Sequence, residues 1–257
     1  MSMHIFCKDA APTAESIVAH IALNDVNATC GIVAPTGTDF SVCYGLVRRG
    51  ANLNADIVYD KALQLVRLNE AGIAVPGVLK NCGMDTIDVN GINNDWYPML
   101  ARKRRHFKGK DIVWIPNANA FTRKIRKIRT SDFLVRYISK EREFRVHVLG
   151  GRWASISEKV NEEVDAIDPN VRGSLIWAHR YGWQHKLMGK CKLRGDVARI
   201  AIDATEVLDF QFGAVDVMLG VDGNLYVLEI NSAPSLNERR VEKYANYFMS
   251  EYRSAQQ

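Results

Sequence analysis

The chain lacks the features of secreted and membrane proteins. It has no C-x-x-C pair, and an odd number of cysteines does not make a closed disulfide framework, so a reducing compartment is the simpler inference. The cysteines are Cys7, Cys30, Cys43, Cys82 and Cys191. The N-terminal MSMHIFCKDA has no long apolar core, and nowhere do about eighteen apolar residues run together, which argues against export and membrane spanning. We therefore expect a cytoplasmic protein with no membrane partner.

The signatures of three kinds of active site are also missing. No G-x-x-x-x-G-K-[ST] motif occurs, which excludes a P-loop as the phosphate site. The scattered histidines do not have the spacing of zinc ligands, and such histidines are more often structural. No cysteine has a base beside it in the sequence that would indicate a nucleophile. Phosphate chemistry, if present, must therefore use another architecture.

Positive charge is concentrated in two short runs. The net charge is +5, and the runs are RKRRHFKGK (102–110) and RKIRKIR (123–129). Composition alone favours a solvated loop for the first and a solvent-facing helix or loop for the second. The alternative for the second is a basic strip that binds an acidic peptide or nucleic acid. Both runs point to a local anionic partner.

The most informative segment is GAVDVMLGVDGNLYVLEINSAPSL, which predicts a β-hairpin about Asp222-Gly223. A tight two-residue turn would place Val221 opposite Asn224, and counting outward pairs Asp216 with Glu229. The same count predicts an apolar face from the pairs Val215 with Ile230, Val217 with Leu228 and Leu219 with Tyr226. The two carboxylates would then lie together on the other face.

Two like charges across a ladder repel unless a cation lies between them. Asn231 follows two residues after Glu229, and carboxylates with an amide carbonyl are oxygen ligands suited to Mg²⁺ or Mn²⁺. The alternative is a solvated acidic edge. The hairpin therefore predicts a metal site formed by Asp216, Glu229 and Asn231.

Hydrophobic patterns predict mixed helices and strands along the chain. Helices are expected over 14–24, over 59–72, where Leu63, Val66 and Leu68 would be the apolar positions, and over 195–210. Strands are expected in MHIFC, NATCGIVAP, IAVPGVL, WYPMLA, DIVWI, FLVRYI and on both sides of Gly150-Gly151. Residues 161–190 follow no clear pattern. No internal repeat or low-complexity segment appears.

The order of these elements resembles the ATP-grasp superfamily. The motifs are KALQLVRLNEAGIAVP, the basic loop, E-F-R-V-H-V, and YVLEINSAPSL, which is similar to the strand V-x-E-x-N-x-x-P of that family. The resemblance extends from Tyr59 to Leu236 and is to carboxylate-amine ligases. These include the glutamate-adding ligases of ribosomal protein, glutathione synthetases, D-alanine:D-alanine ligases and, more distantly, tubulin tyrosine ligases.

The resemblance implies an α+β ATP-grasp fold, in which two α+β subdomains clasp ATP. We expect a short N-terminal α/β region at 1–58, a subdomain with the basic phosphate loop at 59–133, and a C-terminal subdomain with the metal site at 134–257. It also implies ATP and Mg²⁺ as cofactors, with Mn²⁺ as the alternative. Asp216, Glu229 and Asn231 match the metal ligands of the family, in agreement with the hairpin count.

Other roles carry over residue by residue. Arg102 lies where the family has a phosphate-binding lysine, which is a departure because arginine has a different donor geometry, and Lys103 competes for the role. Gly109 lies in the loop that matches the flap over the phosphates. Arg136, Tyr137 and Ile138 match the hinge that holds adenine through backbone groups.

Three charged residues on the next strands complete the expected site. Glu143 would bind the ribose hydroxyls, and Arg145 matches an arginine near the phosphates or the acyl phosphate. Lys159 lies where relatives have another basic residue near the phosphates. For Glu143 and Arg145 the alternative is a surface cross-strand pair, and for Lys159 the two interpretations are evenly balanced.

The resemblance implies an enzyme that forms an amide through an acyl phosphate, with a carboxylate and an amine as substrates and an acidic peptide or protein as one candidate acceptor. The second hypothesis is a kinase of the same fold. The third is a polyanion-binding module with a vestigial ATP site, in which nucleic acid is the less favoured partner. A homo-oligomer that completes the pocket stays open.

Overall fold

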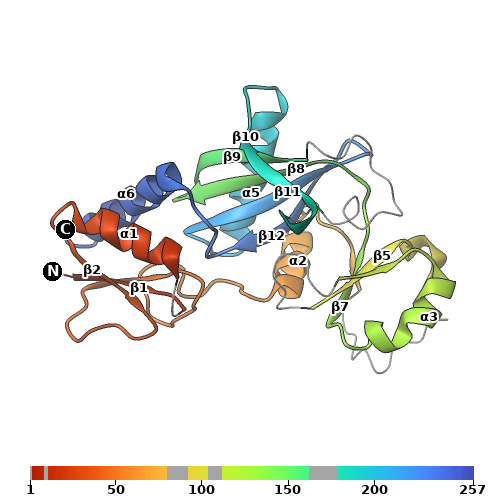
Figure 1. The fold of residues 1–257 in the computed structure, drawn as a ribbon, viewed down its shortest axis with the longest axis horizontal. Coiled ribbons are helices and arrows are strands. Elements are labelled where there is room, and N and C mark those ends of the chain that lie inside the picture. The colour runs from red at the N-terminus through yellow and green to blue at the C-terminus, as the bar shows by residue number, and fades with distance from the viewer. Residues whose placement is uncertain (1, 9–10, 80–91, 104–111, 162–176, 178) are drawn as a thin grey trace.

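The structure is a computed structural model of the 257-residue chain, and it describes residues 2–8, 11–79, 92–103, 112–161, 177 and 179–257. Three β-sheets with helices packed on them lie in a row, with the largest sheet in the middle (Figure 1). This mixed architecture confirms the predicted α+β class. The boundaries at 58/59 and 133/134 stay predictions.

The N-terminal sheet is parallel, with strand order β2-β1-β3. Its strands are β1 (Ser2–Phe6), β2 (Asn27–Gly31) and β3 (Phe40–Cys43), and helix α1 (Pro12–Ala22) connects the first two. The C-terminal helix α6 (Glu238–Ser254) packs against α1, so that the two ends of the chain share one core (Figure 1). Sequence reasoning predicted neither β3 nor α6.

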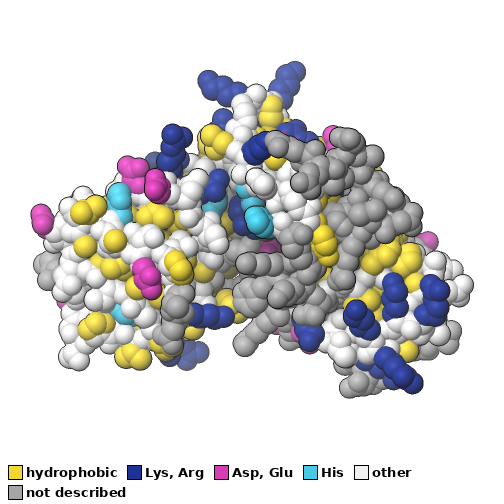
Figure 2. All heavy atoms as spheres, viewed as in Figure 1, with side chains coloured by type: hydrophobic (Ala, Val, Ile, Leu, Met, Phe, Trp, Pro, Cys, Tyr) yellow, Lys and Arg dark blue, Asp and Glu magenta, His cyan; other side chains and the backbone are white. Residues whose placement is uncertain are grey.

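A four-stranded sheet lies at the opposite end of the molecule, with order β4-β7-β5-β6. Its strands are β4 (Val78–Leu79), β5 (Met99–Arg102), β6 (Val113–Ile115) and β7 (Phe133–Arg136). Helix α3 (Ala118–Ile128) covers it and begins at Asn117, whose side chain accepts a hydrogen bond from the backbone N–H of Ala120. Figure 2 shows Lys and Arg side chains gathered over the part of the surface where α3 lies.

The central sheet is antiparallel, with order β10-β9-β8-β11-β12. Its strands are β8 (Lys140–Leu149), β9 (Arg152–Val160), β10 (Gln184–Leu187), β11 (Phe212–Gly220) and β12 (Leu225–Asn231). Helix α5 (Leu193–Val207) buries Val197 and Ala204 against one face, as its 3.6-residue pattern predicts. The other face carries charged side chains and is called the charged face below.

Helix α2 (Lys61–Glu70) packs against the edge strand β12. The predicted apolar face is wrong in one position, because Leu63 is exposed and the neighbouring Gln64 is buried. The Gln64 amide explains the difference, since it donates to the carbonyl of Ile230 at 3.2 Å and accepts from the Ile230 N–H at 3.0 Å. These two bonds fix the start of α2 beside the last strand.

The hairpin between β11 and β12 confirms the central prediction and corrects its turn. Asp216 pairs with Glu229, and Val215 pairs with Ile230. The turn has three residues rather than two, because the Gly220 N–H bonds to the carbonyl of Asn224, and the pairs nearest the turn are therefore shifted by one residue. Val217 faces Val227, and Leu219 faces Leu225. A β-bulge next to Asp216 restores the predicted register.

No helix among the described residues is long and apolar enough to cross a membrane.

Candidate functional site

The predicted metal ligands lie side by side on the charged face. Asp216 on β11 is directly opposite Glu229 on β12, and on its other side it faces Arg145 of β8. Asn231 follows on the same strand face as Glu229, and its amide nitrogen lies 3.4 Å from Asp216 Oδ2 and 3.2 Å from Glu229 Oε1. Asp216 is buried, so the solvated acidic edge is not what the structure shows for it.

Each carboxylate contacts cationic groups. Arg145 donates two parallel hydrogen bonds to Asp216, at 2.7 and 2.9 Å, and this pairing outweighs burial and raises the pKa of Arg145. Lys61 Nζ lies 2.7 Å and Arg102 Nη2 3.2 Å from Glu229 Oε2. The repulsion expected between two opposed carboxylates is thus offset by three cations, one from each of three parts of the fold.

The donor set fits a hard divalent cation. Among the described residues no three His, Cys, Asp or Glu side chains lie together, so a metal here would take two carboxylates and one amide. Rotating the Asn231 amide by half a turn would present its oxygen instead of its nitrogen, and these two orientations are nearly indistinguishable in shape. Oxygen ligands of this kind with phosphate oxygens are the usual environment of Mg²⁺.

Lys61 belongs to this site although sequence reasoning did not assign it. It is the first residue of α2 and follows Asp60, whose carboxylate caps the helix by accepting from the N–H groups of Ala62 and Leu63. The capping pattern is readable in the sequence, but the contact with Glu229 requires the packing of α2 on β12, which is 168 residues away in the chain.

Glu143 lies between two lysines on the charged face. It is two residues before Arg145 on β8 and pairs with Met218 of β11. Its Oε2 accepts from Lys140 Nζ at 2.7 Å, and its Oε1 makes a short contact with Lys159 Nζ. Burial would raise the pKa of Glu143, but Lys140 and Lys159 outweigh it and lower the pKa to about 2. Both carboxylate oxygens are engaged, so Glu143 holds the two lysines here, and its predicted ribose contact stays a prediction.

Lys159 and Lys140 are supported by a stacked tryptophan pair. Lys159 also donates to the carbonyl of Trp177 at 2.8 Å, and Lys140 lies 4.7 Å from the centre of the Trp177 ring. Trp177 stacks on Trp183 with ring centres 3.9 Å apart, and both rings are buried. Glu143 and Asp216 raise the pKa of Lys159 against the effect of burial. Lys159 is therefore a fixed cation near Asp216.

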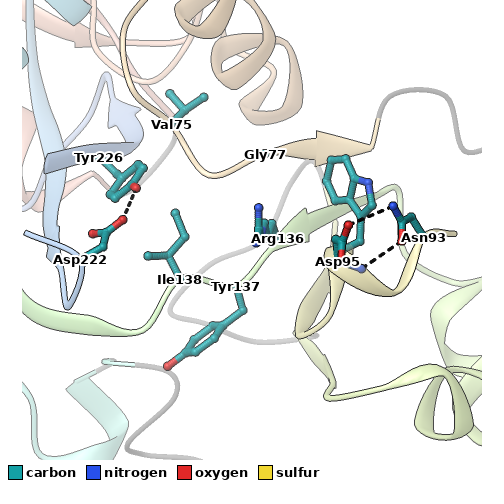
Figure 3. Close-up of a pocket in the computed structure, with 10 residues that line it drawn as sticks. Val75, Gly77, Asn93, Asp95, Arg136, Tyr137, Ile138, Asp222 and Tyr226 are labelled. Carbon is teal, nitrogen blue, oxygen red and sulfur yellow. Dashed lines mark hydrogen bonds between the residues drawn. The ribbon is translucent and has the colours of Figure 1, made fainter. Parts of the chain in front are cut away.

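A cavity of about 580 Å³ lies beside the turn of the β11–β12 hairpin. It is lined by the predicted hinge residues Arg136, Tyr137 and Ile138 and by residues that sequence reasoning did not assign, namely Val75, Gly77, Asn93, Asp95, Trp96, Asp222 and Tyr226. Figure 3 shows Tyr226 and Asp222 joined by a hydrogen bond at one side, with Asn93 and Asp95 at the other. Aromatic and aliphatic side chains share the walls with charged and amide groups, which suits a planar polar ligand.

Arg102 and Lys103 leave the four-stranded sheet toward the charged face. Arg102 ends β5, packs over the ring of Phe133 and reaches Glu229, and the half-buried Lys103 follows it. Of the two candidates for the phosphate contact, Arg102 is therefore the one that meets a predicted metal ligand. Gly109 lies outside the described residues.

Polar groups also fill the end of the charged face beyond Asp216. Arg240 of α6 donates from Nε to Ser155 Oγ at 3.2 Å, and His147 Nδ1 lies 3.0 Å from the Tyr244 hydroxyl. Burial, followed by the charge of Arg240, lowers the pKa of His147 to about 3. Burial, followed by Arg145, lowers that of His185 to about 4. Both imidazoles are neutral at neutral pH.

These histidines predict that the fold is sensitive to acid. The folded-state pKa of His147 is below the ordinary 6.5, so the unfolded chain binds the proton first. Above pH 6.5 this histidine does not reduce the free energy of unfolding. Between pH 6.5 and about 3 it does, and the loss amounts to about 2 kcal/mol at pH 5. In urea titrations, His147→Gln should show a weaker loss of stability between pH 7 and 5.

The matched control for this experiment is His179→Gln, because His179 is exposed. It should keep the pH dependence of the native chain. Part of that dependence will persist in His147→Gln, since burial also lowers the pKa of His4 and His185. Equal slopes in the native chain and His147→Gln would contradict the assignment.

Comparisons with known proteins identify the architecture. No protein-family model and no curated protein sequence matches the chain. Solved structures match over nearly its full length. The ATP-grasp ligase PsnB complexed with minimal precursor is 11% identical, with a TM-score of 0.69, over 98% of this chain and 99% of PsnB. The D-alanine–D-alanine ligase from Bacillus anthracis is 13% identical, with a TM-score of 0.73, over 100% and 99%.

The chain adopts the ATP-grasp fold. A third similar structure is the macrocyclase MdnC bound with precursor peptide MdnA from Microcystis aeruginosa MRC, at 11% identity and a TM-score of 0.64, over 97% of this chain and 100% of MdnC. The Bacillus anthracis ligase has also been solved with ATP, and PsnB with Mg and ADP. The ATP-grasp fold predicted from the sequence is confirmed, while the roles of individual residues stay predictions.

Within this ATP-grasp fold, most of the predicted residues come together between the central and four-stranded sheets. Asp216, Glu229, Asn231, Arg145 and Arg102 form one contact network. The structure adds Lys61 and Lys140 to the predicted cations. Strand alternation would place Lys140 and Glu143, three residues apart, on opposite faces, and an irregularity in the pairing of β8 with β11 brings them together, so the sequence held no signal for this contact.

Proposed function

We propose that the chain is an ATP- and Mg²⁺-dependent carboxylate-amine ligase. A substrate carboxylate attacks the γ-phosphorus of ATP, the bond to the β,γ-bridging oxygen breaks, and an acyl phosphate and ADP result. An amine then attacks the acyl carbon, phosphate leaves, and the amine loses a proton as the amide forms. The observation that carries the proposal is the network of Asp216, Glu229 and Asn231 with cations from three parts of the fold.

The protein's own task is electrostatic. Arg145 and Lys159, both fixed by carboxylates on the charged face, would offset charge that develops on the transferred phosphoryl group. Arg102 and Lys61 lie beside Glu229 and would turn to phosphate oxygens. Asp216, Glu229 and Asn231 would hold Mg²⁺, which supplies positive charge to phosphate oxygens when bound. No protein nucleophile is required.

The cavity beside the hairpin turn is the proposed site for adenine. The distance between this cavity and the carboxylates can be counted along β11. Asp222 and Tyr226 line the cavity at the turn of the hairpin, and Asp216 lies four residues before Gly220. A strand rises about 3.3 Å per residue, so the cavity and the carboxylates are separated by about the length of a ribose and a triphosphate. Arg136, Tyr137 and Ile138 would hold the base at this end.

A peptide is the proposed acceptor class. Similar structures contain precursor peptides, and the basic surface of this chain suits an acidic segment. A kinase would use the same ATP site, and product analysis distinguishes the two reactions. A ligase makes an amide and free phosphate, whereas a kinase makes a phosphorylated product and no free phosphate.

Calorimetry with ATP and Mg²⁺ tests the ATP site. The native chain should bind ATP only weakly without Mg²⁺, and Asp216→Asn should weaken Mg²⁺-dependent binding by about tenfold or more, since a charged ligand is lost. The matched control is Asp203→Asn, at an exposed position of α5. No binding by the native chain would contradict the ATP site, and unchanged binding by Asp216→Asn would contradict the metal site.

One observation favours a second activity, which is binding of polyanions. Four exposed cations lie on or just after α3, namely Arg123, Arg126, Lys127 and Arg129, and no carboxylate of the described residues contacts them. Such a surface predicts binding that weakens steeply with salt. If a polyanion bound tightly and ATP did not bind at all, the polyanion-binding module would become the better description.

A further inference from the structure

One arginine on the charged face, Arg240, has no acidic partner among the described residues. Arg240 is half-buried on the first turn of α6, and its Nε donates to Ser155 Oγ at 3.2 Å. No carboxylate within the described residues contacts its guanidinium, and the charges nearest to it include Arg145. Every other cation discussed on this face is paired with a carboxylate. An unpaired guanidinium that is partly removed from water calls for an anion.

Buried polar atoms around Arg240 also lack partners. Within the part of the chain that the structure describes, the completely buried His147 has no hydrogen-bond partner at Nε2, although its Nδ1 lies 3.0 Å from the Tyr244 hydroxyl. Ser157 is completely buried, and its hydroxyl has none either. Strand register places His147 beside Ser155, and Ser157 beside Arg145, in adjacent rows of the sheet. Unsatisfied buried groups are rare in folded proteins, and a water molecule, an ion or a ligand can complete them.

The cluster has a defined position relative to the proposed ATP site. The row of Ala214, His147 and Ser155 is two residues further along the strands than the row of Asp216 and Arg145. The cavity at Asp222 and Tyr226 lies in the opposite direction, at the hairpin turn. The cluster therefore lies beyond the carboxylates as seen from the cavity, on the side where a group that attacks the γ-phosphate must approach.

The distance along the strands also decides which part of a substrate could bind there. Two residues of a strand span about 6.5 Å, so an anion held by Arg240 in the row of Ser155 would lie one row away from Asp216, beside rather than at the position of the carboxylate that receives the phosphoryl group. It must be another anionic group of the same molecule. Arginine binds carboxylates with two parallel hydrogen bonds, and the hydroxyl and imidazole neighbours add further donors.

We propose that Arg240, with Ser155 and His147, binds a second, non-reacting carboxylate of the acid substrate, so that the enzyme selects dicarboxylic acids or acidic residues over monocarboxylic acids. This inference rests on the proposed ligase function for the identity of the site. A second carboxylate site would define the class of acid substrate, which the ATP site does not.

Binding of glutarate and butyrate, a diacid and a monoacid of similar length, tests the inference by calorimetry without nucleotide. The native chain should bind glutarate about tenfold or more tightly than butyrate, since a charged hydrogen-bonded pair is gained. Arg240→Gln should abolish this preference, and Arg240→Lys should restore part of it. The matched control is Arg239→Gln, the exposed neighbour on the same helix, which should keep the preference.

Two outcomes would overturn the inference. One is a native chain that binds glutarate no better than butyrate, and the other is an Arg240→Gln protein that keeps the preference. If Arg240→Gln does not fold, Ser155→Ala replaces it, and an undiminished preference in that variant counts against the cluster in the same way. Mg²⁺-dependent ATP binding is measured on the same proteins. A native chain that binds ATP with Mg²⁺ but does not prefer the diacid would contradict the inference alone, whereas a native chain that does not bind ATP would contradict the ligase.

Discussion

Replacing Glu229 with Gln is expected to lower Mg²⁺-dependent ADP formation by about 100-fold or more, measured with a panel of dicarboxylic acids and amines. Glu229 faces Asp216 across the hairpin, and a neutral amide is a weaker ligand for a divalent cation and for the two cations that contact Glu229. The fold should change little. The Glu229 side chain is about 15% exposed, and loss of its ion pairs should cost at most about 1–2 kcal/mol of unfolding free energy.

The matched control is Glu242→Gln, at an exposed position of α6 away from the hairpin. It carries the same chemical change and should keep full turnover. Thermal unfolding of both variants separates a catalytic defect from a structural one. Full ADP formation by Glu229→Gln would remove Glu229 from the metal site, and a large drop in its melting temperature would show that its role is mainly structural.

Replacing Phe248 with Ala should cost about 3–5 kcal/mol of unfolding free energy, measured by urea denaturation. Phe248 is completely buried in the core that α6 shares with the N-terminal sheet. Its ring centre lies 4.9 Å from that of Phe212 on β11 and 6.1 Å from that of Tyr244. The cavity left by the ring would therefore weaken the packing of α6 against α1 and against the central sheet at the same time.

Arg253→Ala is the control for this helix, because Arg253 is exposed near its end. It should change stability by no more than about 0.5 kcal/mol. A comparably small effect of Phe248→Ala would mean that α6 contributes little to the shared core. The N-terminal sheet would then have to be stable without it.

The hairpin shows how far local sequence rules extend. The Asp-Gly signal and strand alternation were enough to pair Asp216 with Glu229, because both predict a turn near Gly223. The predicted pairs nearest the turn were wrong, because the three-residue loop shifts the register by one residue. The β-bulge next to Asp216 shifts it back, so the predicted pairing is correct from Asp216 onward. Bulges are stabilised by neighbours on adjacent strands, which a single segment of sequence does not reveal.

The cations were harder to predict than the carboxylates. Arg145 and Lys159 were assigned from the resemblance to the ATP-grasp family, and strand alternation placed Arg145 on the same face as Glu143. Lys61 and Arg240 lie on helices, and their contacts with Glu229 and Ser155 arise from packing between segments far apart in the chain. The shared core of α1 and α6 belongs to the same class, because no local pattern connects the two ends of the sequence.

The contacts of Arg102 and Lys61 with Glu229 join separate parts of the fold through one carboxylate. Arg102 belongs to the four-stranded sheet and Glu229 to the central sheet. If Glu229 binds a metal ion, as we propose, the ion competes with Arg102 and Lys61 for the same carboxylate. Metal binding would then weaken this contact between the two sheets and leave the arginine and the lysine available for phosphate oxygens.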